Sequence, residues 1–285
     1  MREVIFEGIL DCLKIEKVRL NKDQIIPCNY FSDEYEIYYL NDGEGELFLE
    51  KETYFIKKGN LVLINNGQLH KISFSKGTLY DRIRIQIKEE EFHSLFKLSE
   101  KETKKFSYFF DTYHGIFELN EKEQMGVEAI LCDIVDEIRN KYSGYQWMAY
   151  IKLIEFFIFI VRRKSSDFHS DKTISPRHEK VQEIAEYIIS NFSTEQTLEQ
   201  LADQFLINKN TLSRMFKEIT GFTVIEYINL QRMKKARELL LDKTISVTEI
   251  ATLLGYESIT YFGRIFKRYM GMTPLKYRNK ILLQK

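Results

Sequence analysis

Two basic side chains recur in the same frame near the end of the sequence, and they indicate contact with a polyanion. Arg214 and Lys217 return fifty residues later as Arg264 and Lys267. A guanidinium donates paired hydrogen bonds to a phosphate or to the edge of a guanine, and an ammonium is a point charge that suits phosphate. A single arginine on a helix is ordinarily solvated, whereas recurrence of the Arg–Lys pair in the same frame favours contact with a polyanion by both copies.

The repeat continues into residues that would position these groups. Further identities at the offset of 50 are Phe216, Gly221 and Thr223 with Phe266, Gly271 and Thr273. Leu201-Ala202 recurs as Ile250-Ala251 at an offset of 49, so the second copy has one extra residue in its connecting turn. Each copy predicts a short helix, a tight turn and a longer basic helix, which is the outline of a helix-turn-helix. That motif places its second helix in the major groove, so double-stranded DNA is the predicted partner.

Local helix signals support this outline from residue 179 onwards. Helices are expected at 181–191, 198–204, 209–219 and 223–241, in a short segment ending at 253, at 258–269, and from Pro274. Thr197 is a candidate N-cap, and Ser246 forms a capping box with Glu249. Gly221 and Gly255 stand where helices should end.

Helical spacing divides each recognition helix into a core face and an outer face. The predicted core positions are Leu212, Met215, Phe216 and Ile219, then Phe262, Ile265, Phe266 and Tyr269. The outer positions are Asn210, Ser213, Arg214 and Lys217, then Ile259, Thr260, Gly263, Arg264, Lys267 and Arg268. The outer faces are the predicted DNA-contacting surfaces. For Lys217 and Lys267, phosphate contact and a solvated face are both open.

Charge is unevenly distributed, although the whole chain has 42 basic and 42 acidic residues. Residues 177–285 hold 17 Lys and Arg against 12 Asp and Glu, a net charge of +5, which leaves 25 against 30, or −5, for the rest. Such asymmetry is typical of a nucleic-acid-binding segment. A chain of 285 residues should form about two domains.

Cellular location is indicated by the cysteines and by the lack of targeting signals. Cys12, Cys28 and Cys132 are odd in number and lack motif spacing, which suits reduced thiols in the cytoplasm. The N-terminus does not have the architecture of a secretory signal, and the most apolar stretch, 151–161, is too short to span a bilayer. A membrane partner is not expected.

The N-terminal part has a different character. Short β-type runs at 36–40, 45–50, 61–64 and 81–87 are separated by Asn, Asp and Gly turn signals, which predicts an antiparallel sandwich or barrel over residues 1 to about 90. Helices are expected from about 120 to 163, with apolar stripes at Met125, Ile130, Ile134 and Ile138 and at Ile151, Ile154, Ile158 and Val161.

The second of these helices is apolar on more than one face, so a single seam cannot bury it. A homodimer interface is the expected solution. The polar segment 164–177 is expected to be an interdomain linker, followed by the helical domain 178–285.

The repeat segment resembles the DNA-binding domain of the AraC/XylS family of bacterial transcription factors. The resemblance rests on L-S-R-M-F-K (212–217), G-F-T-V-I-E-Y-I-N-L-Q-R-M-K-K-A-R-E-L-L (221–240), I-A-T-L-L-G-Y-E-S (250–258) and Y-F-G-R-I-F-K-R-Y-M-G-M-T-P-L-K-Y-R (261–278). It implies DNA contacts from Asn210, Ser213 and Arg214 and from Ile259, Thr260, Gly263 and Arg264. Ile259 and Gly263 stand where many relatives carry polar residues, which favours apolar contact by the second helix, for example with a thymine methyl.

The N-terminal part resembles the cupin-like barrel of the same family, through 35–45, 57–70 and 80–87. Taking Glu36 as the glutamate of a cupin metal set, the early histidine positions fall near Tyr30 and Ser32, and only His70 matches the late one. Two ligands are too few for a stable transition-metal site, so neither a metal nor another cofactor is expected.

Polar residues of the strands are the candidates for binding an effector. They are Glu36 and Tyr38 on one strand face, Arg82 and Arg84 on a later strand, and His70. Either they grip a sugar, a small acid or another metabolite, or they satisfy one another inside the barrel. His70 is equally consistent with a rim residue.

The sequence therefore predicts an α+β protein. A cupin-like β-barrel with dimerisation helices precedes an all-α domain with two helix-turn-helix motifs. The leading functional hypothesis is an effector-responsive transcription regulator, with RNA polymerase as a further partner of an activator. The alternatives are a regulator without a ligand and a cupin enzyme or carbohydrate-binding protein fused to a DNA-binding module.

Overall fold

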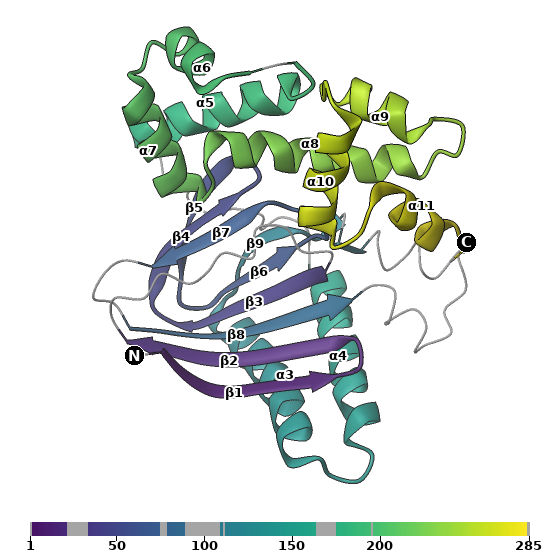
Figure 1. Cartoon of the computed structure of the whole chain (residues 1–285). Coiled ribbons are helices and arrows are strands. Elements are labelled where there is room, and N and C mark those ends of the chain that lie inside the picture. Colours follow the sequence, from purple (N-terminus) through teal and green to yellow (C-terminus); the bar gives the residue numbers. More distant parts are fainter. Residues whose placement is uncertain are drawn as a thin grey trace. The chain divides into compact units, whose positions relative to one another are not determined.

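The computed structural model forms two compact units, which comprise 1–49 with 54–173 and 50–53 with 174–285. The structure describes residues 2–21, 34–74, 79–88, 109–110, 112–163, 175–194 and 196–283. Strands fill most of the first unit and helices the second, as expected for the α+β class (Figure 1). Among the described helices, none combines the length and the apolar character that crossing a bilayer would require.

The described strands of the first unit form two antiparallel sheets. They are β1 (Arg2–Leu10), β2 (Leu13–Asn21), β3 (Glu34–Asp42), β4 (Glu44–Leu49), β5 (Glu52–Lys57), β6 (Asn60–Ile64), β7 (His70–Phe74), β8 (Leu79–Lys88) and β9 (Gly115–Glu118). Six strands pair in the order β1-β2-β8-β3-β6-β9, and three in the order β5-β4-β7. No ladder between described strands closes the two sheets into one barrel, so the sandwich is the better description of the two expected forms.

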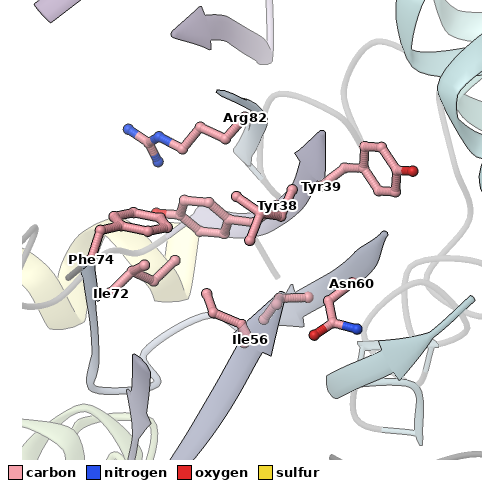
Figure 2. Close-up of a pocket in the computed structure, with 9 residues that line it drawn as sticks. Tyr38, Tyr39, Ile56, Asn60, Ile72, Phe74 and Arg82 are labelled. Atoms are coloured by element: carbon pink, nitrogen blue, oxygen red, sulfur yellow. The ribbon is translucent and has the colours of Figure 1, made fainter. Parts of the chain in front are cut away.

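Side chains alternate across the larger sheet, which gives it two different cores. Tyr35, Ile37 and Tyr39 of β3 lie in the core that the sheet shares with the helices of this unit. Tyr38 and Leu40 lie in a second core, which the sheet shares with the three-stranded sheet. Figure 2 shows Tyr38 and Tyr39 pointing to opposite sides of β3.

The strand-rich region extends beyond the expected limit near residue 90. Strand β9, at 115–118, pairs with β6, with Leu61 opposite Phe117. A four-residue strand contains too few alternations to be recognised from sequence. Its place in the sheet depends on pairing with a partner more than fifty residues away.

Two helices cover the outer face of the six-stranded sheet, α3 (Glu121–Asn140) and α4 (Tyr145–Arg162) (Figure 1). Asn120 and Glu123 form a capping box at the start of α3. The predicted stripe of α3 is buried at Ile130, Ile134 and Ile138, whereas Met125 is 65% exposed and does not belong to the core. Met125 precedes Ile130 by five residues, a rotation of about 140° around the helix, so it faces away from the buried stripe.

The second unit consists of seven described helices. They are α5 (Pro176–Asn191), α6 (Leu198–Gln204), α7 (Lys209–Thr220), α8 (Val224–Leu240), α9 (Val247–Leu253), α10 (Ile259–Met270) and α11 (Pro274–Leu283). The expected N-caps Thr197 and Ser246 both form capping boxes. Gly221 ends α7 with φ of 86°, a left-handed conformation in which glycine has no steric penalty.

Helix α5 begins five residues before the expected start at residue 181. Ser175 caps it through the backbone N–H of His178, and Pro176 occupies its first turn. A serine followed by proline is a helix-start signal, because proline needs no hydrogen-bond acceptor there. The last two residues of the expected linker 164–177 therefore belong to α5, and 164–174 lie outside the described residues.

Candidate functional site

The two predicted recognition helices, α7 and α10, have the same pattern of burial over residues 211–220 and 261–270. Six of the eight predicted core positions are buried, namely Leu212, Met215, Phe216, Phe262, Ile265 and Phe266. The last two, Ile219 and Tyr269, are half-buried, and the next residues, Thr220 and Met270, are buried instead. Thr220 is held inside by hydrogen bonds, since its hydroxyl donates to Phe216 O at 2.7 Å and accepts from Phe222 N.

The basic side chains of both outer faces are exposed and free of acidic partners. Arg214, Lys217, Arg264 and Lys267 are all exposed, and none of the four makes an ion pair with any described residue. Other exposed lysines of this unit do, such as Lys235 with Glu238 at 2.6 Å. The four unpaired cations are therefore available to phosphates, whose neutralisation drives binding to DNA.

The remaining predicted contact residues differ in their exposure. Asn210 and Thr260 are exposed, Ser213 is half-buried, and Ile259 is 45% exposed. Gly263 is half-buried, and a Cβ placed on it would have no neighbour within 4 Å. The backbone of α10 is thus open to close approach at this point. Which of these residues contacts DNA stays a prediction.

Local sequence positions both recognition helices. Asn208 accepts hydrogen bonds from the first N–H groups of α7, with a distance of 2.9 Å to Asn210 N. Ser258 caps α10 through Tyr261 N, and the guanidinium of Arg264 lies 5.1 Å from the centre of the Tyr261 ring. The turn of the second helix-turn-helix, 254–258, is one residue longer than the turn of the first, 205–208. The change of offset in the sequence repeat predicted this difference.

The candidate effector residues gather on the inner face of the six-stranded sheet. Strand register places Arg84 of β8 between Glu16 of β2 and Tyr38 of β3. The Tyr38 hydroxyl donates to Glu36 Oε2 at 2.6 Å, and Arg82 Nη2 donates to Glu16 Oε1 at 2.6 Å. All five side chains are buried or nearly so. We call them, with His70 and Gln86, the interior polar cluster.

Opposite charges are matched within this cluster. Arg84 Nη1 lies 3.4 Å from the Tyr38 hydroxyl and 3.9 Å from Glu36 Oε2, and Gln86 Nε2 donates to Glu36 Oε1 at 3.4 Å. Burial, followed by the nearby charge of Glu36, raises the pKa of Tyr38 far above its usual value, so the phenol stays a hydrogen-bond donor. These side chains contact one another, but Arg82 Nε and Arg84 Nε are buried without a hydrogen-bond partner among the described residues. Whether the cluster also binds an effector stays a prediction.

A cavity of about 10 Å³, with room for roughly one water molecule, adjoins the cluster. It is lined by Tyr38, Tyr39, Leu40, Ile56, Asn60, Val62, Ile72, Phe74 and Arg82. Figure 2 shows Tyr38, Phe74, Ile56 and Ile72 facing one another, with Arg82 at one side.

His70 contacts two members of the cluster: its Nε2 lies 3.8 Å from Glu36 Oε2, and its ring lies edge-on to the Tyr38 ring, with 6.1 Å between the ring centres. It is buried and does not form an exposed rim. Among the described residues, no group of three or more His, Cys, Asp or Glu side chains is placed to hold a metal ion. Tyr30 and Ser32, at the early cupin positions, lie outside the described residues.

Sequence reasoning missed two members of the cluster, Glu16 and Gln86. Alternation places Glu16 on the same strand face as the buried Val18, and this mixture of charged and apolar residues gives no clear pattern. The partners of Glu16 lie on β8, more than sixty residues further along the chain. Only the strand register brings them together.

Helix α4 presents a second apolar stripe that this unit leaves uncovered. Ala149, Leu153, Phe156 and Ile160 are buried on one side. The opposite side exposes Trp147 (65%), Ile151 (56%), Ile154 (40%), Ile158 (44%) and Val161 (51%). Their spacing of four, three, four and three residues is that of a coiled-coil seam. We call these five residues the α4 seam.

Comparison with known proteins matches both units to described families. Residues 30–106 match the AraC-like ligand binding domain, and residues 201–280 match a helix-turn-helix domain. The bifunctional transcriptional activator/DNA repair enzyme AdaA of Bacillus subtilis is 34% identical over 119 residues, which is 40% of this chain and 56% of that protein. The xylose operon regulatory protein of Escherichia coli K12 is 32% identical over 123 residues, 42% of this chain and 29% of that protein.

A solved structure is similar in the C-terminal part. The C-terminal domain of AraT, a response regulator from Geobacillus stearothermophilus, is 37% identical, with a TM-score of 0.36, and the match covers 38% of this chain and 88% of that one. The chain spans about half, or less, of the length of the two curated relatives.

Proposed function

Because the chain belongs to the AraC/XylS family of bacterial regulators, we propose that it controls transcription by binding specific DNA sequences through both helix-turn-helix units. The observation that carries this proposal is the repeated outer face, on which α7 and α10 each expose an arginine and a lysine without a described acidic partner. An enzymatic role is not proposed, since the two matched families are a helix-turn-helix domain and a ligand binding domain. Cytoplasmic location follows from the need to reach DNA.

DNA affinity should reside in a fragment of residues 174–285 and should fall steeply with salt. If the four unpaired cations neutralise four phosphates, log affinity should change with log salt with a slope of about −3 to −4. Fluorescence anisotropy with labelled duplex DNA from 50 to 200 mM salt measures this slope. Binding by a fragment of residues 1–170, without binding by 174–285, would contradict the assignment.

We propose that the interior polar cluster binds a small polar organic effector, such as a sugar or a small acid. A polyol suits it best, because hydroxyl groups can replace hydrogen bonds to Glu36, Tyr38 and Arg82 without changing the matched charge of the cluster. The match to a ligand-binding domain supports this role, as does the naming of one relative for a xylose operon.

Effector binding should stabilise the first unit against heat. At a ligand concentration of 100 Kd, mass action adds about 2.7 kcal/mol to the free energy of unfolding. Thermal unfolding of the full chain with a panel of sugars and small acids tests this. The variant Tyr38→Phe should lose most of the shift, whereas Tyr54→Phe, changed in the smaller sheet, should keep it. An equal shift in both variants would place the ligand elsewhere.

We propose that the α4 seam joins two copies of the chain. An exposed seam of five apolar residues is costly in water, and a two-fold dimer is the common way to cover it. A dimer also suits a regulator that binds paired half-sites. In an activator, RNA polymerase would be an additional partner.

Charged residues in the seam should produce a monomer. The double variant Ile154→Glu and Ile158→Glu places two carboxylates in each copy of the buried contact, where unpaired charge is strongly unfavourable. Sedimentation velocity should then show the monomer mass. Phe55→Glu is the matched control, because Phe55 is an exposed apolar residue of the same unit at 37% exposure. A double variant that remains a dimer would exclude the seam as the interface.

A further inference from the structure

The two halves of the DNA-binding unit are in contact away from their recognition helices. The first half comprises α5, α6 and α7, the second comprises α9, α10 and α11, and α8 runs through both. A long helix fixes the distance along its own axis. It does not prevent each half from rocking about that axis, so a second contact is needed to fix their relative orientation.

Arg232, in the middle of α8, makes such a contact with both halves. Its Nε donates to Phe192 O at 2.7 Å and its Nη2 donates to Thr194 O at 3.1 Å, in the turn that follows α5. The same guanidinium lies 4.9 Å from the centre of the Tyr256 ring, in the turn that precedes α10. The planar guanidinium is suited to this task, because it can stack on a ring while donating to two carbonyl groups.

Gly255 brings the two turns directly together. A Cβ on Gly255 would lie 2.0 Å from Ser193 O and 3.2 Å from Arg232 Nη2, so a larger residue cannot fit without moving one half. The φ of Gly255 is 77°, which also favours glycine. The backbone of the second half therefore rests against the backbone of the first, beside Arg232.

Tyr256 completes the contact from the side of α8. Its hydroxyl donates to Asn229 Oδ1 at 2.9 Å, and Asn229 is buried one turn before Arg232. The ring is thereby held where the guanidinium can stack on it. One side chain, Arg232, therefore contacts Phe192, Thr194 and Tyr256.

We propose that Arg232 is a positioning residue that fixes the orientation of the two recognition helices and so sets the spacing of DNA segments that the protein accepts. This inference rests on the proposed function in DNA binding. Arg232 would act without touching the bases, by keeping the second helix from following a DNA segment that is displaced. Loss of the contact should relax the spacing requirement and weaken binding to correctly spaced DNA.

The test uses the full chain and duplexes in which one base pair is inserted between the two contacted segments. Each insertion turns the second segment by about 34–36° and shifts it by about 3.4 Å. In the wild-type protein, we expect an insertion to reduce affinity by about tenfold or more, since a specific contact is worth that factor. For Arg232→Ala, we expect the insertion to reduce affinity by less than about threefold, because the variant already binds the correctly spaced duplex more weakly.

Two further variants separate this role from a general effect on folding. Arg237→Ala removes another arginine of α8, whose Nε donates to Tyr277 at 2.9 Å within the second half, and should keep the full spacing penalty. Gly255→Ala retains Arg232 but forces the turns apart, and should relax the penalty as Arg232→Ala does. Hydrogen exchange without DNA should rise at 192–194 and 255–256 in Arg232→Ala, with α7 and α10 still protected.

A full spacing penalty in both Arg232→Ala and Gly255→Ala would overturn the positioning role. Absence of any sequence-specific affinity in the wild-type protein would instead overturn the proposed function, and the inference with it.

Discussion

Replacing Arg82 with methionine should destabilise the first unit by about 3 kcal/mol, the lower end of the range for breaking a buried ion pair. The change leaves Glu16 buried without its nearest cation, which lies at 2.6 Å. The loss should stay near the lower end because Arg84 Nε remains 3.6 Å from the same carboxylate oxygen. Urea unfolding of the full chain, followed by circular dichroism, measures the shift of the transition.

The matched control is Arg19→Met in the same sheet. Arg19 pairs with Asp81 at 2.9 Å, but its side chain is 57% exposed, so its loss should cost at most about 1 kcal/mol. Adding Glu16→Leu to Arg82→Met should recover much of the lost stability, because no unpaired charge is then buried. Equal losses for Arg82→Met and Arg19→Met would show that the interior pair is effectively hydrated.

The variant Arg214→Ala should reduce affinity for the specific DNA site by one to two orders of magnitude. A paired hydrogen-bond contact from arginine contributes about 1–3 kcal/mol of discrimination. Arg214 is suited to such a contact because it is exposed on the outer face of α7 and makes no ion pair with a described residue. Anisotropy titration with specific and scrambled duplexes separates base recognition from general attraction.

Lys243→Ala is the control for this variant. Lys243 is also exposed and lies between α8 and α9. Its substitution by alanine removes one positive charge, as Arg214→Ala does. Its effect should be within about threefold and equal for both duplexes, as for a remote surface charge. Equal effects at the two positions would mean that the wrong face of α7 has been assigned to DNA.

The helical unit was predictable because its signals are local. Thr197, Ser246 and Gly221 specify helix ends within a few residues of themselves, and the repeat supplied each prediction twice. The wrong core predictions concern the last turns of the recognition helices, where spacing does not determine which residue is buried. Ile219 and Tyr269 were assigned to the core by spacing alone, whereas the next residues, Thr220 and Met270, are the buried ones.

The interior polar cluster was less predictable because it depends on distant pairing. Alternation correctly placed Glu36 and Tyr38 on one face of β3, and their hydroxyl–carboxylate contact is 2.6 Å. It could not identify Glu16 as the partner of Arg82, since this requires the register of β2 on β8. The α4 seam is intermediate. Four of its residues, Ile151, Ile154, Ile158 and Val161, were predicted as an apolar stripe, but their exposure depends on which side of the helix packs on the sheet.

Selection of DNA sites by the full chain tests the central claim most directly. The protein is allowed to select from random duplexes, and the selected sequences are mapped by hydroxyl-radical footprinting. We expect an enriched motif with two protected segments on one face of the DNA, about one helical turn or 10 base pairs apart. Arg214→Ala should lose base preference in one segment, and Arg264→Ala should weaken protection of the other. Equal affinity for selected and scrambled duplexes, or protection unaffected by both variants, would contradict recognition by the paired helices α7 and α10.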